Sequence, residues 1–502
     1  MSSVEKKITK SVVYQFFNFL FSGLVGILFI PFIINNIGAS RYGLFEIVFS
    51  LNIINAVLDL GIGSTIVNYT DKYLKQGKLV FTNFFWSYFW LKFFLSILGV
   101  FLCLIIAYNV HFFFNQINIE GQRILKLSIQ WFAIGVIIQN INSFITAIQN
   151  GFVRFDLSSS ASIISKIFYI LIFFIWWYGV DIHSIIGFSF ITFVLVPTFK
   201  LIIQIAQVRK LLISNLCGVS WGKKVYILDT FNYLKGISII TIFGQLFNYG
   251  SQFLLSVISY PEIVGQFGIL KRIVTLIQTI SSMIIRPILP AAQALKDNYS
   301  LSKIILTGTQ FHAIVIVGLN LLVIINAQFI NIYFFEGIYN DFSWTIFLIC
   351  APSLLPSFSI MLMIYYSEGK VKMSVQFNVL NTVFSLLFAY VGYLHFKLEG
   401  FLIGLSLGYT LILIFQVYRY LKLFAININK FLRIYLYQFI NIVLVFSLNF
   451  LLEKNIYSFL VLNITSVLIL LYIGWISSNH SLKLIMKNKL LTLIHKNKKY
   501  DL

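Results

Sequence analysis

The stretch from Ile37 to Tyr69, IGASRYGLFEIVFSLNIINAVLDLGIGSTIVNY, decides how the fold of this chain is predicted. It is apolar and long enough to span a membrane, yet it carries Arg41, Glu46 and Asp59. An ionised side chain at the centre of a membrane helix costs about 2.5–3.5 kcal/mol on insertion scales. Charges retained in such a segment therefore predict a functional site inside a membrane protein.

The composition supports a membrane protein with many spans. Hydrophobic residues make up 59% of the 502 residues and charged residues only 11%, whereas charged residues are about a quarter of a soluble domain. The formal net charge is +21, but most Lys and Arg lie in short connectors between apolar runs. This placement is typical of membrane topology, so no nucleic-acid partner is expected.

Apolar runs of about 20 residues predict an all-α polytopic protein with about fourteen membrane-spanning helices. Long, continuously apolar runs do not fit the short alternating strands of a barrel. The predicted spans are Ser11–Asn35, Gly43–Ile66, Phe81–Tyr108, Lys126–Asn150, Ser159–Tyr178, Ile185–Ala206, Thr230–Ser256, Gly265–Leu289, Ile304–Asn326, Ser343–Tyr366, Ser374–His395, Gly400–Tyr420, Ile434–Leu452 and Tyr457–Ile476.

The basic residues predict the orientation of the chain. They are concentrated in the connectors on the side of the N-terminus, which places both termini in the cytoplasm when the number of spans is even. The tail after Lys483 is rich in Lys and suits anionic lipid headgroups. All connectors are short, so the functional residues are expected among the helices.

A weak internal repeat predicts two halves. Tyr42-Gly43 opens the second span, and Phe267-Gly268 lies near the start of the eighth. The charged residue that follows the glycine is acidic in the first copy, Glu46, and basic in the second, Lys271. An offset of six spans predicts parallel repeats related by an axis along the membrane normal. The predicted organisation is an N-lobe of helices 1–6 (residues 1–206), a cytoplasmic linker (207–229), a C-lobe of helices 7–12 (230–421), and helices 13 and 14 with a basic cytoplasmic tail (422–502).

Polar side chains form stripes at helical spacing. Asn52, Asn55 and Asp59 share one predicted face, and similar stripes occur on the fourth and seventh spans, at Gln139 and Asn142 and at Gln245, Asn248 and Gln252. One stripe alone is explained by hydrogen bonds between helices. Stripes in both halves favour a shared hydrated interior.

Several basic residues lie inside the predicted spans. Arg286 is near a cytoplasmic end, where its guanidinium can reach the interface, and the Lys271-Arg272 pair is closer to the outer end of its span. Lys92 lies near mid-membrane and needs an acidic partner, a hydrated cavity or an anionic ligand. Asp59 is a candidate partner for it.

Motifs for other chemistries are absent from the sequence. Gly38 to Gly43 has the glycine spacing of a phosphate loop but lacks the following Lys, so ATP hydrolysis is not expected. The three cysteines and six histidines have no disulfide or metal-ligand spacing. No nucleophile and base are paired, so the chain is not expected to be an enzyme or to hold a metal or other cofactor.

The opening stretch also carries a family resemblance. An apolar first helix with Pro31, then GASRYG at residues 38–43 and LDLGIG at residues 58–63, resembles the polysaccharide transporter family of the multidrug/oligosaccharidyl-lipid/polysaccharide exporter superfamily. Within it, the chain resembles the Wzx-type O-antigen flippases. The resemblance implies two six-helix lobes of the kind found in multidrug and toxic compound extrusion (MATE) transporters, around a central cavity, with two additional C-terminal helices.

The resemblance also implies a function in a bacterial inner membrane. The expected activity is translocation of undecaprenyl-diphosphate-linked O-antigen or other polysaccharide units from the cytoplasmic to the periplasmic leaflet by alternating access. A basic cavity suits the diphosphate, and amide side chains suit sugar hydroxyls. The implied partners are the lipid-linked oligosaccharide, membrane lipids and the polysaccharide polymerase machinery. The resemblance further implies coupling to an ion gradient, with Asp59 or Glu46 as the group that couples H⁺ or Na⁺.

Three other functions remain open at this point. A lipid II flippase shares the predicted architecture and an anionic lipid-linked substrate. An O-antigen polymerase or ligase usually carries a large periplasmic loop, which is missing here. A drug or cation antiporter is expected to have acidic cavity residues, whereas the intramembrane surplus of this chain is basic.

Overall fold

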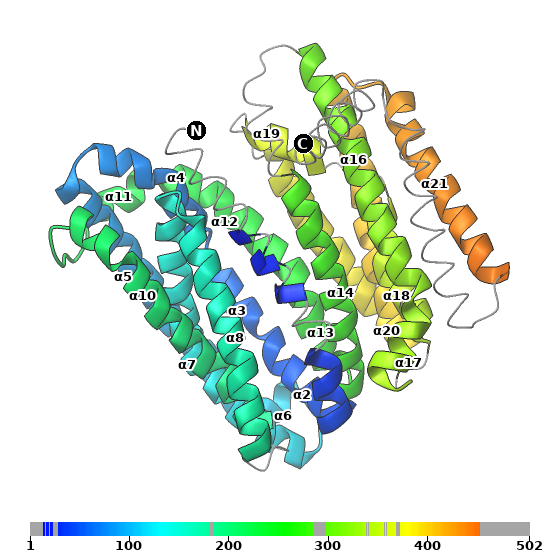
Figure 1. Ribbon diagram of the computed structural model, residues 1–502, viewed down its shortest axis with the longest axis horizontal. Helices are drawn as coiled ribbons and strands as arrows, with labels where there is room; N and C mark the ends of the chain where they lie inside the picture. Colours follow the sequence, from blue (N-terminus) through cyan, green and yellow to red (C-terminus); the bar gives the residue numbers. More distant parts are fainter. Residues whose placement is uncertain are drawn as a thin grey trace, which may run out of the picture. The chain divides into compact units, whose positions relative to one another are not determined.

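The computed structural model describes residues 14–15, 17–19, 21–23, 29–179, 185–285, 298–337, 339, 341–355, 357, 359–367 and 372–451. Throughout these ranges the regular structure is helical, without a strand, which confirms the all-α prediction (Figure 1). Eight of the described helical segments are long and apolar enough to cross a membrane. The fourteenth predicted span, Tyr457–Ile476, and the basic tail lie outside the described residues, so the count of fourteen stays a prediction.

The chain divides into two compact units. The N-terminal unit contains residues 1–269 with 334–338, and the C-terminal unit contains residues 270–333 with 339–502. The predicted boundaries of the lobes and linker stay a prediction. The helices of the N-terminal unit are α2 (Ala39–Ser50), α3 (Asn52–Leu58), α4 (Ile62–Lys75), α5 (Lys78–Tyr108), α6 (Val110–Phe113), α7 (Ile119–Gly151), α8 (Phe155–Gly179), α9 (Ile185–Phe190), α10 (Val196–Asn215), α11 (Lys224–Asp229), α12 (Phe231–Gln245), α13 (Ser251–Ile258) and the first part of α14 (Pro261–Ile285).

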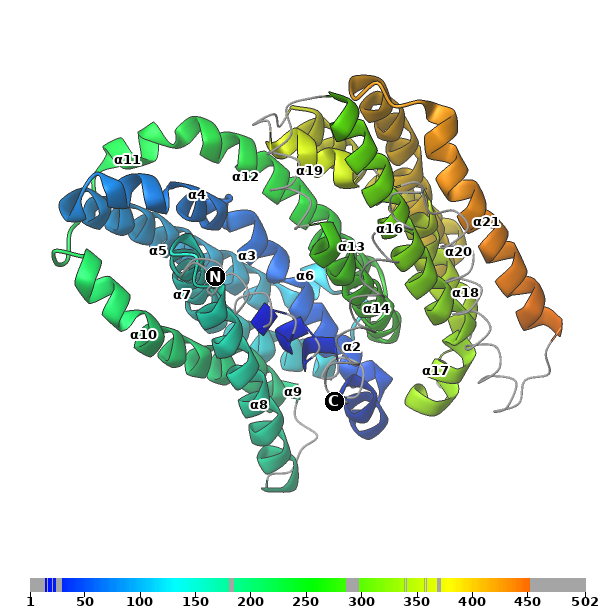
Figure 2. The same ribbon diagram turned by 45° about the horizontal axis from the view of Figure 1, so that its top comes forward.

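Helix α7 is central in the N-terminal unit. It packs against α4, α5, α8 and α10, and these helices run beside it in both ribbon views (Figures 1 and 2). The most extensive packing is with α5, whose aromatic residues Phe85 and Phe89 both contact Phe144 of α7. This bundle carries most of the polar residues described below.

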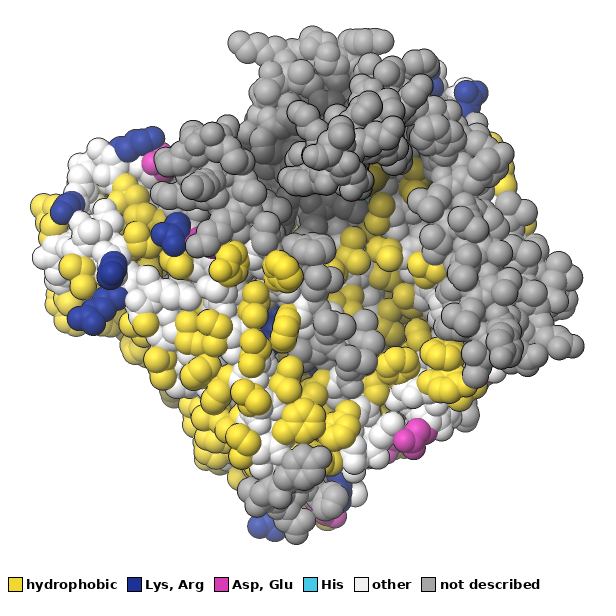
Figure 3. Space-filling model, viewed as in Figure 1, with side chains coloured by type: hydrophobic (Ala, Val, Ile, Leu, Met, Phe, Trp, Pro, Cys, Tyr) yellow, Lys and Arg dark blue, Asp and Glu magenta, His cyan; other side chains and the backbone are white. Residues whose placement is uncertain are grey.

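Helix α5 has its apolar side outside and its polar side inside. Phe94, Leu98, Phe101 and Ile105 follow one helical stripe and are exposed, whereas the opposite stripe, at Lys92, Ser96, Gly99 and Cys103, is buried. In a bilayer the exposed stripe is solvated by lipid tails, so the hydrophobic effect does not drive it into the protein interior. The space-filling view shows hydrophobic side chains over the middle of this unit, with most visible Lys and Arg side chains toward its ends (Figure 3).

The second predicted span is not one helix, which corrects the sequence prediction for Gly43–Ile66. It is divided into α2, α3 and α4, and the last of these continues to Lys75. The break falls in the LDLGIG motif, where Leu60 and Gly61 adopt positive φ angles of 47° and 65°. Ser238 of α12 donates a hydrogen bond of 2.7 Å to the carbonyl of Leu60, which satisfies one of the backbone groups freed by the break.

Three other predicted spans are irregular. The sixth contains a π-helical turn at Ile191–Leu195 and the seventh contains one at Leu246–Gly250. The tenth, predicted as a single helix at Ser343–Tyr366, is divided after a short 3₁₀ turn at Ala351–Leu354, where Pro352 cannot donate a backbone hydrogen bond. Irregular turns of this kind shift the faces on which later side chains lie.

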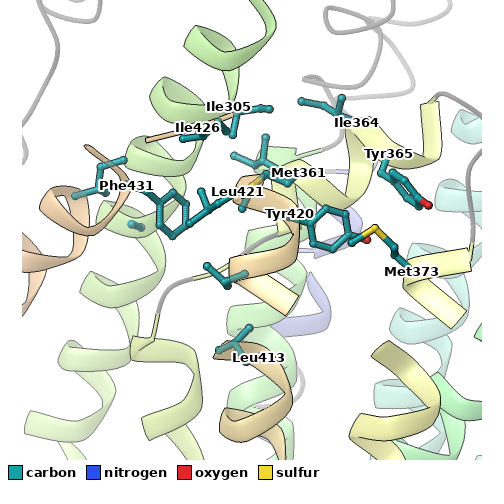
Figure 4. Close-up of a cluster of buried hydrophobic side chains, with 14 of the residues drawn as sticks. Ile305, Met361, Ile364, Tyr365, Met373, Leu413, Tyr420, Leu421, Ile426 and Phe431 are labelled. Carbon is teal, nitrogen blue, oxygen red and sulfur yellow. The ribbon is translucent and has the colours of Figure 1, made fainter. Parts of the chain in front are cut away.

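The C-terminal unit contains the rest of α14, α16 (Asn298–Ile325), α18 (Phe342–Cys350), α19 (Ser359–Ser367), α20 (Lys372–Leu423) and α21 (Ile428–Leu451), with α17 (Ala327–Phe335) on both sides of the boundary. Helix α20 consists of two helices that meet at a kink at Phe396 and Lys397, as expected for the eleventh and twelfth spans. A buried cluster that includes Ile305, Met361, Tyr420 and Phe431 joins α16, α19, α20 and α21 (Figure 4).

Glycines allow the two halves of α20 to pack closely. A Cβ atom placed on Gly404 would lie 2.1 Å from the carbonyl oxygen of Phe388, and one on Gly400 would lie 2.0 Å from that of Gly392. These clashes involve backbone atoms, which cannot move aside as a flexible side chain can.

We expect Gly404→Ala to lower the thermal stability of the purified protein. The added methyl group separates the two halves of α20, and overpacking of this kind costs about 1–3 kcal/mol. The apparent melting temperature in detergent measures the effect. Gly63→Ala is the matched control, because its Cβ would meet Ala147 at an ordinary 3.9 Å. Equal melting temperatures for the two variants would contradict the prediction.

Candidate functional site

The break in the second span places a carboxylate opposite a lysine. Asp59 follows the last residue of α3, and its carboxylate forms a salt bridge with the Lys92 ammonium of α5. Lys92 is only 3% exposed, whereas the side chain of Asp59 is 28% exposed. The ion pair therefore has a buried cationic side and a more accessible anionic side.

An amide network adjoins this ion pair. Asn55, one turn before Asp59, donates to Gln139 at 3.1 Å and accepts from Asn140 at 3.0 Å. Asn55 and Gln139 belong to the stripes predicted from sequence, and the structure brings them together across α3 and α7. Amides that bond to one another in this way fix the two helices in register.

Glu46 forms a second buried polar cluster. It is 1% exposed, accepts a hydrogen bond of 2.5 Å from the Tyr42 hydroxyl and another of 2.7 Å from the Gln252 amide. Gln252 also donates to the backbone carbonyl of Glu46 at 3.2 Å. The cluster joins α2 to α13 through polar contacts that a bilayer could not replace.

The same region is where α2 crosses the start of α14. A Cβ atom on Gly43 would lie 1.8 Å from the carbonyl oxygen of Pro261, and one on Gly268 would lie 2.7 Å from the carboxylate of Glu46. Gly43 and Gly268 are the glycines that define the sequence repeat. The repeat-related segments thus pack against each other through positions without side chains, an arrangement typical of close helix contacts in membranes.

A third polar cluster contains Lys166 of α8. Its ammonium donates to the Asn18 side-chain oxygen at 2.7 Å and to the Ser22 hydroxyl in the first span. Lys200 of α10 is close enough for its charge to repel that of Lys166. Neither lysine has an acidic partner among the described residues.

At the predicted cytoplasmic side, the inter-lobe connector is attached to α5. Trp86 and Trp90 donate to the carbonyls of Gly218 and Ser220 at 2.8 and 3.1 Å, and Trp90 stacks on Trp221. The connector is therefore an ordered part of the N-terminal unit.

The end of this connector is also held by the first half of the bundle. Lys72 and Tyr73 of α4 both donate to the carboxylate of Asp229. These two hydrogen bonds favour the ionised form and lower the pKa of the Asp229 carboxyl. The connector thus contacts both α4 and α5.

The other predicted residues of this unit have varied surroundings. Asn142 donates to the carbonyl of Pro197 at 2.8 Å, Asn52 donates to that of Phe49 at 2.8 Å, and Arg41 is exposed. The π-helical turn interrupts the predicted stripe on the seventh span: Gln252 is buried, Asn248 is exposed and Gln245 is half-buried. An α-helical spacing could not anticipate the extra residue in this turn.

In the C-terminal unit, Lys271 and Arg272 are half-buried on α14, and Thr275 donates to the carbonyl of Lys271 at 2.7 Å. Arg286 lies outside the described residues. No cluster of three or more His, Cys, Asp or Glu side chains in the described part of the chain is placed to hold a metal ion.

The sequence prediction missed Lys166 and Lys200, although both lie within predicted spans. Their position inside the apolar runs Ser159–Tyr178 and Ile185–Ala206 was the available signal. It also missed the pairing of Glu46 with Gln252, which depends on contact between residues far apart in the chain.

We expect Lys92→Met to destabilise the protein by about 3 kcal/mol, because it leaves Asp59 without its cationic partner. Asp59→Asn should have a comparable effect, and the double variant should lose less than the sum of the two. Unfolding of the purified variants in mixed detergent micelles measures the free energies. Lys75→Met, which breaks an exposed ion pair with Asp71, should change stability by only about 0–1 kcal/mol. Additive effects of the two buried substitutions would show that the pair is not energetically coupled.

Comparisons with known proteins agree with this architecture. A family model described as "Polysaccharide biosynthesis protein" matches residues 8–296. Comparison with curated proteins finds no match.

Similar solved structures include the lipid II flippase MurJ in an inward closed conformation, with a TM-score of 0.68 and 14% identity over 93% of this chain and 98% of that one. They also include an inward-facing MATE family transporter of the MOP superfamily (multidrug/oligosaccharidyl-lipid/polysaccharide), with a TM-score of 0.60 and 14% identity over 83% and 94% of the two chains. The MATE multidrug transporter DinF-BH has a TM-score of 0.62 and 14% identity over 84% and 96%. These similarities confirm the predicted MATE-like fold.

Proposed function

Because the chain belongs to the polysaccharide biosynthesis protein family and has the fold of MOP-superfamily transporters, we propose that it is a flippase for polyprenyl-diphosphate-linked oligosaccharides. Its substrate is an undecaprenyl-diphosphate-linked O-antigen or related polysaccharide unit. The protein moves this unit from the cytoplasmic to the periplasmic leaflet by alternating access. It acts in a bacterial inner membrane with both termini in the cytoplasm.

The observation that carries the proposal is the presence of cationic and amide side chains inside apolar, membrane-spanning helices. Lys271 and Arg272 supply positive charge within the spans, and Asn55 and Gln139 supply amides. Lys92 binds Asp59 and fixes that carboxylate beside the amides. Cations lower the cost of moving a diphosphate away from the headgroup region, and amides bond to sugar hydroxyls. The polyprenyl tail remains in the lipid and needs no polar site.

The second candidate is a lipid II flippase. The solved structure of MurJ has the same fold over nearly the whole chain, and its substrate is named as lipid II. Both substrates are anionic and lipid-linked, so the basic residues are compatible with either. The two functions differ in the polymer that fails to form when the protein is missing.

We expect deletion of the gene to abolish a surface polysaccharide and to cause undecaprenyl-linked oligosaccharide units to accumulate. Gel analysis of the surface polymer and mass spectrometry of extracted lipids measure the two effects. Accumulation of lipid II with arrested growth would support the second candidate instead. Normal levels of both polymers would contradict the proposed function.

Within the same strain, Arg272→Ala and Lys92→Ala should fail to restore the polymer while remaining in the membrane. Arg209→Ala, which removes an exposed arginine, is the control and should restore it fully. The level of each variant in the membrane fraction separates loss of transport from loss of protein. Normal polymer with both intramembrane variants would remove these residues from the mechanism.

Coupling to an H⁺ or Na⁺ gradient is part of the proposal, with Glu46 preferred to Asp59 as the coupling carboxylate. Asp59 is engaged by the Lys92 ammonium, and exchange of a proton or Na⁺ there would leave that buried cation unbalanced. Glu46 bonds to Tyr42 and Gln252 at the place where α2 meets α13 and α14. A change in the charge of Glu46 would therefore alter the contacts among these three helices.

We expect Glu46→Gln to remove stimulation of transport by an imposed gradient while leaving substrate binding intact. The glutamine keeps a hydrogen-bonding side chain of the same shape but no longer titrates or carries charge. Uptake of a short-chain lipid-linked sugar into proteoliposomes, with pH or Na⁺ gradients applied separately, measures the effect. Asp59→Asn is the comparison variant. Gradient stimulation that persists in Glu46→Gln would exclude this carboxylate from coupling.

A further inference from the structure

The Lys166 and Lys200 pair lies between helices that the proposed mechanism has not used. The two lysines belong to α8 and α10, which pack against each other through stacked rings of Phe168 and Phe199, with centroids 4.0 Å apart. Gln207 of α10 also donates to the Ser160 hydroxyl of α8 at 3.1 Å, so the two helices run antiparallel and place Lys166 and Lys200 at a similar level of the bundle. The positive charge of Lys200 is near enough to act on the Lys166 ammonium.

The hydrogen-bond partners of Lys166 are all neutral. The ammonium contacts the side-chain and backbone oxygens of Asn18, at 2.7 and 3.4 Å, and the Ser22 hydroxyl. Ser22 in turn donates to the carbonyl of Asn18 at 2.6 Å, which fixes the first-span side of the cluster. These contacts orient the ammonium without neutralising it.

Lys200 is half-buried and forms no hydrogen bond or ion pair with any described residue. The nearest acidic residue in α8, Asp156, is already held by two hydrogen bonds from Arg154. Lys92, in contrast, has Asp59. Within the described part of the bundle, Lys92 thus has a carboxylate partner, whereas Lys166 and Lys200 do not.

Two like charges inside a membrane-spanning bundle raise its free energy unless an anion accompanies them. Neutral oxygens satisfy the hydrogen-bond donors of Lys166 but supply no countercharge. Lys200 still has donors to offer, and charge-assisted bonds from ammonium to phosphate oxygens are among the strong ones. A ligand with two or more negative oxygens matches a site with one cation on each of two packed helices.

We propose that Lys166 and Lys200 form a binding site for the phosphate or diphosphate group of a polyprenyl-linked lipid. This inference rests on the proposed function and names residues for its anionic headgroup. Lys200 bonds to the phosphate oxygens directly. Asn18 and Ser22 hold Lys166 beside the phosphate, so the site is built from the first span, α8 and α10.

The test uses full-length protein in phosphatidylcholine nanodiscs and farnesyl diphosphate as the probe. We expect Lys166→Gln/Lys200→Gln to raise the Kd for farnesyl diphosphate about tenfold or more. Lys166→Arg/Lys200→Arg keeps both charges and should restore binding to within a few-fold of wild type. Lys223→Gln/Lys224→Gln, which removes two exposed charges from the connector, is the matched control and should bind as wild type does.

Competition experiments identify the source of the anion. Farnesol should not compete, because it lacks the charge. Inorganic diphosphate that bound as tightly as the probe would make a free anion the ligand and contradict the lipid assignment. Loss of probe binding in phosphatidylglycerol nanodiscs would assign the site to bulk anionic phospholipid and contradict it as well.

The complementation assay separates this inference from the proposed function. Wild-type affinity for the probe in the glutamine double variant, together with normal polymer when that variant replaces wild type, would overturn the inference and leave the flippase proposal intact. An unaltered surface polymer in the deletion strain would overturn the flippase proposal. Monodisperse elution of each variant on size exclusion shows that a change in Kd does not result from misfolding.

Discussion

The interaction between Asp59 and Lys92 is central to the N-terminal unit. A buried ammonium in a membrane helix cannot be left alone, and a carboxylate at a helix break supplies its charge partner. The second span is interrupted directly after that carboxylate, at Leu60 and Gly61. The interruption frees the backbone carbonyl of Leu60, and Ser238 of α12 donates a hydrogen bond to it. This bond connects the second span to the seventh.

Membrane packing explains why polar residues hold this unit together. Lipid tails solvate apolar side chains as well as a protein interior does. The apolar stripe of α5 can therefore stay exposed at the surface of the unit. Specific association must then come from close backbone contacts and hydrogen bonds. Gly43 and Gly268 provide the first, and the bonds of Glu46 with Tyr42 and Gln252 provide the second.

The intramembrane charges differ in how they are balanced, and this distinction bears on function. A lysine paired with a carboxylate, such as Lys92, is chiefly a fixed element that shapes its surroundings. Lysines held by neutral oxygens, such as Lys166, have hydrogen-bond partners but no countercharge from them. Only the second kind can gain and lose an anion without breaking an internal ion pair.

Composition and hydropathy were enough to predict an all-α membrane protein with many spans, and the motifs GASRYG and LDLGIG carried the family resemblance, because these depend on local properties of each segment. The charged positions Glu46, Asp59 and Lys92 were also evident from sequence, since ionisable residues are rare in apolar runs. The break at LDLGIG, the π-helical turn before Gln252 and the partners of Lys166 were not evident. Each depends on which side chains from distant spans meet inside the bundle, and helical spacing within one segment carries no information about that meeting. The sequence determined which segments enter the membrane, whereas only the tertiary structure decided which of the described charges have a carboxylate partner and which are held by neutral oxygens.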